Sequence, residues 1–424
     1  MTIPLRKPAI YYGWWVLAVA FTGEMFAIGS TTYAFGLFVK PLSEAYAADR
    51  ATINIGLMLF IVGMGLSAPV IGRLLDRYPA RTLMPLGALV MGGGMAGVAL
   101  SPSLPLMALC ILLPVAVGAV MIGPLAANTL GARWFVRRRG LALGIIAVGT
   151  SVGGAVLVPL MAFTMEHYGW RGALLIQGGL IALVVGALTL LVVRNRPQEL
   201  GLRPDGDAAS PLTAGPAVAE ASWTVLQALR HRDFWCIALA VGLTFAVNQS
   251  TLISLVPYGT DRGFTLQQAQ WLVSALAACS IFGKLVLGAL ADRVDKRWLL
   301  LVVVAAIGVE QTALLLQPGF ATLLIVCGLA GFASGGTLPL WAALIGERFG
   351  ARSFGTVMGL MNPVNMAVSL VAIGFIGRVF DVTGSYDLAF QVFLGVALAA
   401  AALAVAITPR SAVASVPATA SGTP

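Results

Sequence analysis

Long apolar runs recur from one end of the chain to the other, and they constrain its fold more than any other feature. A helix needs about 20 mainly apolar residues to cross a bilayer. Only 10% of the residues are charged, whereas an ordinary soluble domain carries about 25%. The chain is therefore expected to be an all-α integral membrane protein. The twelve expected spans are 14–38, 52–75, 82–100, 104–130, 140–165, 170–193, 234–259, 268–291, 298–316, 319–345, 355–380 and 386–408.

The Lys and Arg positions predict the orientation of these spans. With both termini in the cytoplasm, twenty of the 26 basic residues fall on the cytoplasmic side, which is the usual bias of membrane proteins. The first run follows Arg6 and Lys7 and is rich in Trp and Tyr instead of ending at a cleavage site, so it is expected to be retained. The expected location is the inner (plasma) membrane, crossed many times.

The charge and cysteine pattern excludes several classes of function. The net charge of +9 comes from basic residues at cytoplasmic helix ends, which are topology signals, so no nucleic-acid partner is expected. The four cysteines lie within spans and show no CxxC or CxxH spacing, so neither a disulfide framework nor a zinc site is expected. No metal and no cofactor is implied. The expected partners are the lipid bilayer and a small molecule, and the expected functional state is a monomer.

A repeated phrase shows that the chain is duplicated. The phrase Gly-x-Leu-x-Asp-Arg-x-x-x-Arg begins at Gly72 and again at Gly288, an offset of 216 residues. A second pair, Arg133-Trp134 and Arg348-Phe349, recurs at an offset of 215. Both offsets are close to half of the 424 residues, so two pseudo-symmetric six-helix bundles are expected. The expected divisions are a first bundle at 1–193, a cytoplasmic linker at 194–232, a second bundle at 233–409 and a disordered tail at 410–424.

Twelve spans, a central loop and the repeated phrase closely resemble the major facilitator superfamily, in which two related halves rock about a site near the bilayer midplane. Further motifs look like the monocarboxylate porters and the bacterial oxalate:formate antiporter. These motifs are Tyr12-Gly13-Trp14-Trp15, Phe38-Val39-Lys40-Pro41, Arg133-Trp134-Phe135, Arg138-Arg139-Gly140-Leu141-Ala142-Leu143-Gly144 and Gly169-Trp170-Arg171. The Gly-Pro motif that drug antiporters of the superfamily carry in span 5 is not found between Gly149 and Pro159, so multidrug efflux is disfavoured.

Lys284 is the first candidate for substrate binding. It lies eight residues before Asp292, or about 12 Å into the bilayer at 1.5 Å per residue, and a buried ammonium group needs an anion. In the porters that this chain resembles, an Arg stands four residues before the Gly of the loop phrase and holds the substrate carboxylate. Lys284 stands four residues before Gly288, so the resemblance implies the same role. A lysine that snorkels to the cytoplasmic interface is the alternative.

Glu24 is the candidate for proton coupling. It lies twelve residues after Tyr12, about 18 Å from the cytoplasmic end, a depth comparable with that of Lys284. Some animal members of the family pair the span 8 cation with an Asp one turn earlier, where this chain has Ser280, and their span 1 lysine is not evident here. We therefore hypothesise that Glu24 pairs with Lys284 when the site is empty and is protonated or displaced by an anionic substrate. A structural Glu between helices is the alternative.

Uncharged polar residues within spans are expected to complete the substrate site, although each alone is more often a helix–helix hydrogen bond. The substrate-binding candidates are Tyr33, Asn128, Asn248, Gln249 and Asn362; Tyr258 and Asn365 are further polar residues of this set. Glu310 and Gln311 lie near the outer end of span 9 and are expected to be solvated.

The charged residues of the repeated phrase are expected to gate the carrier. At cytoplasmic helix ends they cannot reach a midplane substrate, and charge pairs there would latch the halves when the cavity opens outward. Topology and helix capping explain the arginines but not the repeated Asp. The gating candidates are Asp76, Arg77, Arg81, Asp292, Arg293 and Arg297.

The sequence thus predicts a secondary active transporter of small organic anions, with monocarboxylates as the expected substrates and proton coupling as one mode. An exchanger of carboxylates, or an efflux carrier of another small molecule, stays open. A transporter-like membrane receptor or sensor is the alternative of another class. A membrane-embedded enzyme is disfavoured, because neither HExxH nor facing carboxylate pairs occur in the sequence.

Overall fold

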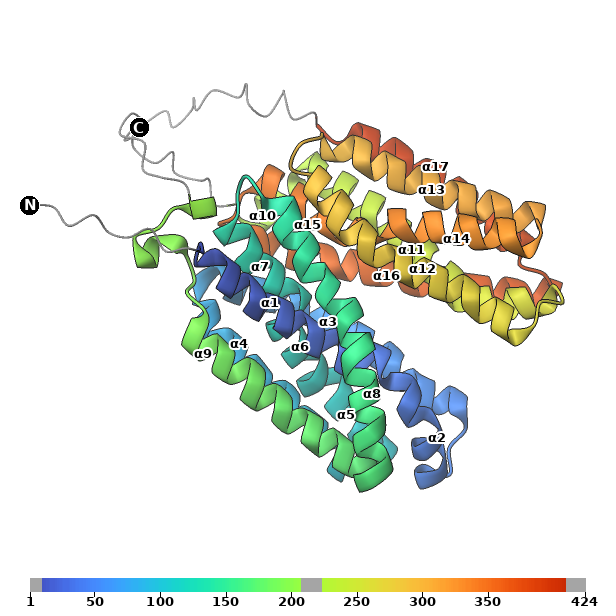
Figure 1. Cartoon of the computed structure of the whole chain (residues 1–424), viewed down its shortest axis with the longest axis horizontal. Coiled ribbons are helices and arrows are strands. Elements are labelled where there is room, and N and C mark those ends of the chain that lie inside the picture. Colours follow the sequence, from blue (N-terminus) through green and yellow to red (C-terminus); the bar gives the residue numbers. More distant parts are fainter. Residues whose placement is uncertain (1–9, 207–222, 409–424) are drawn as a thin grey trace, which may run out of the picture. The chain divides into compact units, whose positions relative to one another are not determined.

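The computed structural model describes residues 10–206 and 223–408, and the regular secondary structure of these residues is helical throughout (Figure 1). The chain divides into two compact units. Unit 1 contains the described residues up to Trp223 together with Phe349–Met366. Unit 2 contains Thr224–Arg348 together with the described residues from Ala367 onward. The first part of one long helix, Phe354–Thr383, therefore belongs to unit 1 and its remainder to unit 2.

The helix bounds follow the apolar runs. Unit 1 contains α1 Gly13–Ile28, η1 Gly29–Tyr33, α2 Phe35–Tyr46, α3 Arg50–Arg77, α4 Ala80–Leu100, α5 Leu104–Cys110, η2 Ile111–Val115, α6 Ala116–Ile122, α7 Pro124–Trp134, α8 Arg139–Leu180, η3 Ile181–Val185, α9 Gly186–Val192, η4 Pro197–Leu200 and η5 Pro204–Gly206. Unit 2 contains α10 Val225–Arg230, α11 Arg232–Asp261, α12 Leu266–Leu290, α13 Lys296–Leu316, α14 Phe320–Gly335 and α17 Asp387–Ala406. α15 Thr337–Phe349 belongs to unit 2 as far as Arg348, and α16 Phe354–Thr383 is divided between the two units.

Eleven helical segments of the described chain are long and apolar enough to cross a membrane. The longest, Arg139–Val192, has 54 residues, or about 80 Å of helix at 1.5 Å per residue, which is enough for two crossings. It is broken at Gly169, whose φ of 69° and ψ of 173° are not helical and are readily adopted only by glycine. Spans 5 and 6 are therefore separate crossings, and the prediction of twelve is confirmed.

Span 1 is longer than predicted and is interrupted. The sequence placed it at 14–38, but helical structure continues to Tyr46, and the five residues of η1 form a π-helical turn within it. π-Helical turns occur often at functional sites. After this span, Asp49 caps α3 by accepting a hydrogen bond from the Thr52 amide at 2.8 Å. Hydrogen bonds from Thr52, first from its hydroxyl and then from its amide, lower the pKa of Asp49.

Small residues bring α12 and α14 into close contact in unit 2, where Figure 1 shows them among the helices of that unit. A Cβ atom at Gly283 would lie 1.8 Å from the Phe332 carbonyl oxygen, and one at Gly335 would lie 2.2 Å from the Ser280 carbonyl oxygen. Membrane helices gain most of their association energy from such close packing, since lipid offers no hydrophobic driving force between them.

Replacing Gly283 by alanine is therefore expected to lower the apparent melting temperature of the purified protein. The neighbouring atom is backbone and cannot rotate away, so α12 and α14 must separate, which costs about 1–3 kcal/mol. This loss outweighs the gain of up to about 1 kcal/mol from helix propensity. The matched control is Gly328→Ala on α14, where the added Cβ would meet only the Cys279 sulfur at 3.5 Å. Equal melting temperatures for the two variants would contradict the packing argument.

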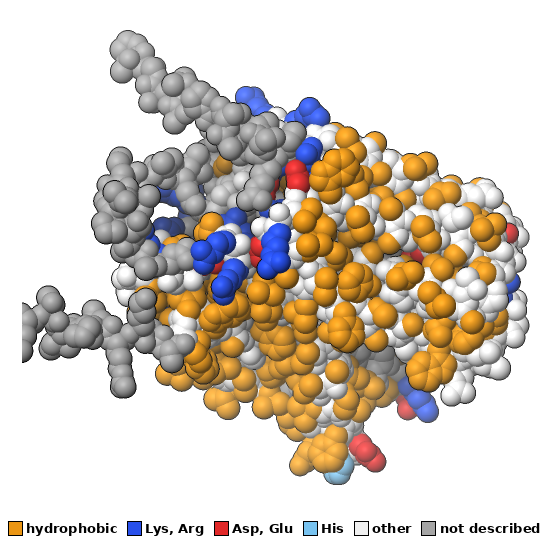
Figure 2. Space-filling view, turned by 45° about the horizontal axis from the view of Figure 1, so that its top comes forward, with side chains coloured by type: hydrophobic (Ala, Val, Ile, Leu, Met, Phe, Trp, Pro, Cys, Tyr) orange, Lys and Arg blue, Asp and Glu red, His pale blue; other side chains and the backbone are white. Residues whose placement is uncertain are grey.

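Hydrophobic side chains cover much of the surface. On the face that Figure 2 shows, they predominate, while most of the visible Lys and Arg side chains gather in one region. Large aliphatic residues are widely exposed, among them Leu183 at 70%, Leu191 at 72% and Val371 at 72%. An exposed apolar surface of this extent is stable only in contact with lipid.

Part of the predicted linker is ordered against unit 1. The carboxylate of Asp205 accepts hydrogen bonds from the backbone amides of Val136, Arg137 and Arg138 at 2.7–3.1 Å, just before α8 begins. The linker also contains η4, η5 and α10. Residues 207–222 of the predicted linker, and the predicted tail at 410–424, lie outside the described residues.

Candidate functional site

Lys284 lies on α12 and is buried, with 6% of its surface exposed. The preceding residue, Gly283, is the point of closest contact with α14. Successive helical residues are about 100° apart, so Lys284 projects from the face of α12 beside that contact. A snorkelling lysine would place its ammonium group at the surface, and the burial of Lys284 therefore argues against the snorkelling interpretation.

Glu24 lies on α1 in unit 1 and is 1% exposed. Its Cβ atom is 3.3 Å from the position that a Cβ would take at Gly149 of α8, so the glycine leaves room for the glutamate between α1 and α8. Further along the same pair of helices, Gly29 and Gly153 bring the backbones together. Glu24 and Lys284 belong to different units, and their pairing stays a prediction.

The uncharged candidates are divided between the units. Tyr33, Asn128 and Asn362 are in unit 1, whereas Asn248 and Gln249 are in unit 2 on α11. Asn128 is buried on α7, and Asn248 and Gln249 are partly buried. Asn362 donates a hydrogen bond to the Met358 carbonyl of its own helix at 2.9 Å, so this bond does not join two helices.

Tyr33 is the candidate with the most distinctive backbone setting. It ends the π-helical turn η1, is 49% exposed, and its ring lies against Gly154 of α8, where a Cβ would meet the ring at 2.9 Å. The Tyr33 ring therefore packs against Gly154 of α8, while part of the side chain remains accessible.

Asp76 binds the first turn of α16. Its Oδ1 accepts a hydrogen bond from the Gly355 amide at 3.2 Å, and its Oδ2 accepts one from the Thr356 amide at 2.6 Å. Gly72, one turn earlier, allows this approach, because a Cβ there would lie 2.1 Å from the Gly355 carbonyl oxygen. The amides at a helix N-terminus carry partial positive charge, so a carboxylate is favourable there. In the first copy of the repeated phrase, Gly72 therefore makes room for the contact that Asp76 forms with α16.

Arg133 completes this cluster and was not among the sequence-derived site residues. Its Nη2 lies 3.3 Å from Asp76 Oδ1 and donates to the Leu75 carbonyl at 2.7 Å, while its Nη1 donates to Asn195 Oδ1 at 2.6 Å. The side chain is buried; its two terminal nitrogens have partners, whereas Nε has none among the described residues. The sequence feature that could have identified Arg133 is its recurrence as Arg348 in the second half of the chain. In unit 2, Arg348 Nε lies 3.9 Å from the Asp233 carboxylate.

Arg81 and Arg297 of the repeated phrase contact other groups. Arg81 donates to the Leu190 carbonyl near the end of α9 at 3.0 Å, and Arg297 binds Asp295 and the Ile407 carbonyl, each at 3.0 Å. These contacts fit the capping interpretation of the arginines. Arg77 and Arg293 are exposed, and Asp292 is partly buried. The gating roles of all six residues stay predictions.

The expectation that Glu310 and Gln311 are solvated is wrong. Both residues are 0% exposed. Depth along the helix suggested solvation, but the buried positions of α13 include Val303, Ile307 and Leu314, and Glu310 falls on the same stripe. A spacing of three and four residues marks one face of a helix, and this signal was present in the sequence.

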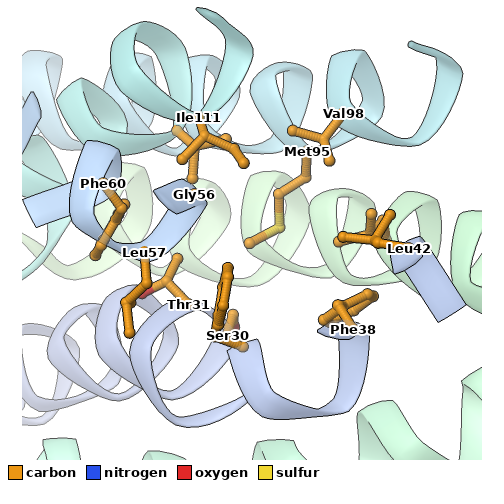
Figure 3. Close-up of a pocket in the computed structure, with 13 residues that line it drawn as sticks. Ser30, Thr31, Phe38, Leu42, Gly56, Leu57, Phe60, Met95, Val98 and Ile111 are labelled. Carbon is orange, nitrogen blue, oxygen red and sulfur yellow. The ribbon is translucent and has the colours of Figure 1, made fainter. Parts of the chain in front are cut away.

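Unit 1 contains an apolar cavity whose thirteen lining residues include no charged side chain. Figure 3 shows it between η1, α2 and α3 on one side and α4 and η2 on the other. Ser30 and Thr31 carry the only polar side chains of its thirteen lining residues, and Ser30 already accepts a hydrogen bond from Gln177 at 2.6 Å. None of the predicted site residues lines this cavity.

A multi-span helical protein with a few buried charged residues and no large soluble loop among its described residues has the architecture of a membrane transporter. The sequence matches the family model of the Major Facilitator Superfamily over residues 19–269 and 239–423. The chain belongs to the Major Facilitator Superfamily, and it is accordingly a transporter and not an enzyme.

Relatives and a solved structure agree with this assignment. The chain is 24% identical over 404 residues to the uncharacterized MFS-type transporter YcxA of Bacillus subtilis, covering 88% of this chain and 90% of the relative. It is 26% identical over 384 residues to monocarboxylate transporter 13 of Bos taurus, covering 90% and 86%. Human monocarboxylate transporter 12 is 30% identical over 281 residues, covering 61% of this chain and 54% of that protein. A crystal structure of a double-tryptophan variant of XylE matches with a TM-score of 0.70, 14% identity and coverage of 93% and 94%, which shows the fold.

Proposed function

We propose that this transporter is a secondary active carrier of small organic anions, with monocarboxylates as its main substrates, and that it works by alternating access. The observation that carries the proposal is the burial of Lys284 at 6% exposure on a membrane-spanning helix. An ammonium group is expensive in a bilayer unless an anion neutralises it. In the proposed cycle, a substrate carboxylate binds to the Lys284 ammonium group. Relatives named monocarboxylate transporters support the same substrate class.

The direct test is counterflow into proteoliposomes that contain the purified protein. Vesicles loaded with one unlabelled carboxylate are diluted into trace labelled carboxylate, and a panel of monocarboxylates, dicarboxylates and one uncharged sugar is compared. We expect labelled monocarboxylate to accumulate transiently and the sugar not to accumulate. Counterflow of the sugar alone would refute the anion proposal, and saturable binding of carboxylate without flux would identify a receptor instead.

Glu24 is proposed to carry the coupled proton. Glu24→Gln should abolish accumulation driven by an inward proton gradient while counterflow at equal pH persists, because a carboxamide cannot exchange a proton but still fills the space between α1 and α8. Uptake with and without the gradient measures the effect. The control is Glu166→Gln, an exposed glutamate of α8, which should behave as wild type. Unchanged gradient-driven accumulation in Glu24→Gln would assign the residue a structural role.

The proposed location is the inner (plasma) membrane, with both termini in the cytoplasm and the monomer as the functional unit. The distribution of Lys and Arg supports this orientation, since twenty of 26 then lie on the cytoplasmic side. Labelling of single cysteines placed in the loops of intact cells, with a reagent that does not cross membranes, tests it.

A further inference from the structure

Unit 2 contains a buried polar cluster that the proposed transport site does not use. Glu310 and Gln311 are adjacent on α13, and both are 0% exposed. Gln311 Nε2 donates a hydrogen bond to the Thr251 hydroxyl on α11 at 3.0 Å. Both carboxyl oxygens of Glu310 and Oε1 of Gln311 are buried without a hydrogen-bond partner among the described residues, as is the hydroxyl of Ser250 beside Thr251. The cluster therefore contains three orphaned acceptor oxygens on two consecutive residues.

Among the described residues, the groups packed against α13 offer no free positive charge to an ionised Glu310. The helices packed against α13 are α11, α14 and α17. Their titratable or charged groups near the Leu316 end of α13 are Tyr258 and Asp261 on α11, Arg262 at the C-cap of α11, Cys327 on α14 and Asp387 on α17.

The one cation of this set is already engaged. Arg262 donates to the Tyr258 hydroxyl and to the Gln317 carbonyl, each at 3.0 Å. Tyr258 in turn donates to the Leu314 carbonyl, one turn beyond Glu310. Cys327 is buried on α14, but a thiol brings no positive charge.

The physical chemistry of such a carboxyl group leaves few choices. An isolated ionised carboxylate in a medium of low dielectric constant is so unfavourable that the group takes up a proton instead. A neutral carboxylic acid still has acceptor oxygens, and leaving them buried and unsatisfied is unfavourable. Internal water satisfies buried groups of this kind and makes about three hydrogen bonds per molecule.

We propose that Glu310, Gln311 and the α11 hydroxyls form an internal proton- and water-binding site in unit 2. Glu310 binds the proton, and water bridges its oxygens to Gln311 and to the Ser250–Thr251 pair. Leu316, at the end of α13, lies six residues beyond Glu310, or about 9 Å along the helix, so the outer side of the predicted topology is the nearer source of the proton. This site is independent of which substrate the transporter carries.

Infrared spectroscopy of the reconstituted protein tests the site without any transport measurement. At neutral pH the wild-type protein should show the carbonyl band of a protonated carboxylic acid that shifts in D₂O, and Glu310→Gln should lose that component. The control is Glu347→Gln, whose carboxylate is paired with Lys296 and should contribute no such band. Identical spectra for wild type and Glu310→Gln in this region would overturn the proposal.

The pH dependence of stability provides a second test. In the unfolded state Glu310 ionises as an ordinary carboxyl, whereas in the folded state it keeps its proton, so the folded state binds more protons and stability falls as pH rises. The apparent melting temperature of wild type should therefore fall more steeply than that of Glu310→Gln between acidic and neutral pH. Parallel curves would overturn the proposal. If Glu310→Gln does not fold, the wild-type protein alone provides the test. Glu310 should keep its proton at acidic and neutral pH, so absence of the wild-type carbonyl band in that range would overturn the proposal.

Discussion

Replacing Lys284 by alanine should reduce carboxylate counterflow to the level of protein-free vesicles, whereas Lys284→Arg should retain a measurable fraction. Truncating one partner of a buried charge pair costs about 2–5 kcal/mol, and each 1.4 kcal/mol is a factor of about ten in affinity. The substrate should therefore bind about 30-fold to several thousand-fold more weakly. Arginine keeps the charge but replaces a compact ammonium group with a planar fork, so it should also alter the order of preference among carboxylates.

The position of Lys284 permits a control for folding. The apparent melting temperatures of Lys284→Gln and Lys284→Ala should be measured beside that of wild type, so that a loss of counterflow is attributed to the substrate site only in a folded variant. Addition of a small primary ammonium ion should partly restore counterflow to Lys284→Ala and not to Lys284→Gln, in which the amide occupies the space. Wild-type carboxylate counterflow in a folded Lys284→Ala protein would show that the substrate is bound elsewhere.

Replacing Asp76 by alanine should lower the maximal transport rate about tenfold to a hundredfold while the half-saturating substrate concentration changes little. Its carboxylate makes two hydrogen bonds to the first turn of α16 and one to Arg133. Hydrogen bonds to charged groups are worth about 1.5–3 kcal/mol each, and a loss of about 3 kcal/mol shifts a two-state equilibrium about a hundredfold. A carrier that spends too little time in one conformation completes fewer cycles, although its substrate site is intact.

Arg73 provides the matched control for Asp76. It lies on the same helix three residues earlier and is exposed, so Arg73→Ala should retain most of the transport rate. Asp76→Asn should be intermediate, since an amide oxygen accepts a hydrogen bond but brings no charge to the helix N-terminus. Initial rates over a range of substrate concentrations separate rate from affinity. Equal losses in Arg73→Ala and Asp76→Ala would indicate a general effect of charge at this membrane face and not a specific contact with α16.

Much of the fold was predictable because membrane spans are a local property of sequence. Apolar runs and their flanking basic residues located twelve crossings, and the structure confirms them, including the break at Gly169 that separates spans 5 and 6. The π-helical turn and the extension of span 1 to Tyr46 were not predictable in the same way. The run Thr31-Thr32-Tyr33-Ala34 carries no strong helix breaker, and its backbone geometry depends on contacts such as that of Gly29 with Gly153.

The sequence by itself determined the class of fold, the duplication and the scarcity of buried charges, because each is set by composition and spacing along the chain. Only the tertiary structure decided which of these charges meet which partners. Asp76 binds two backbone amides about 280 residues away in the sequence, and Arg133 donates a hydrogen bond to the same carboxylate. Glu310 is fully buried, although its position near the end of its helix favoured exposure to solvent. The physical reason is that the partner of a helical residue depends on how helices distant in sequence pack together, and a span's hydropathy records its depth in the bilayer but not its neighbours.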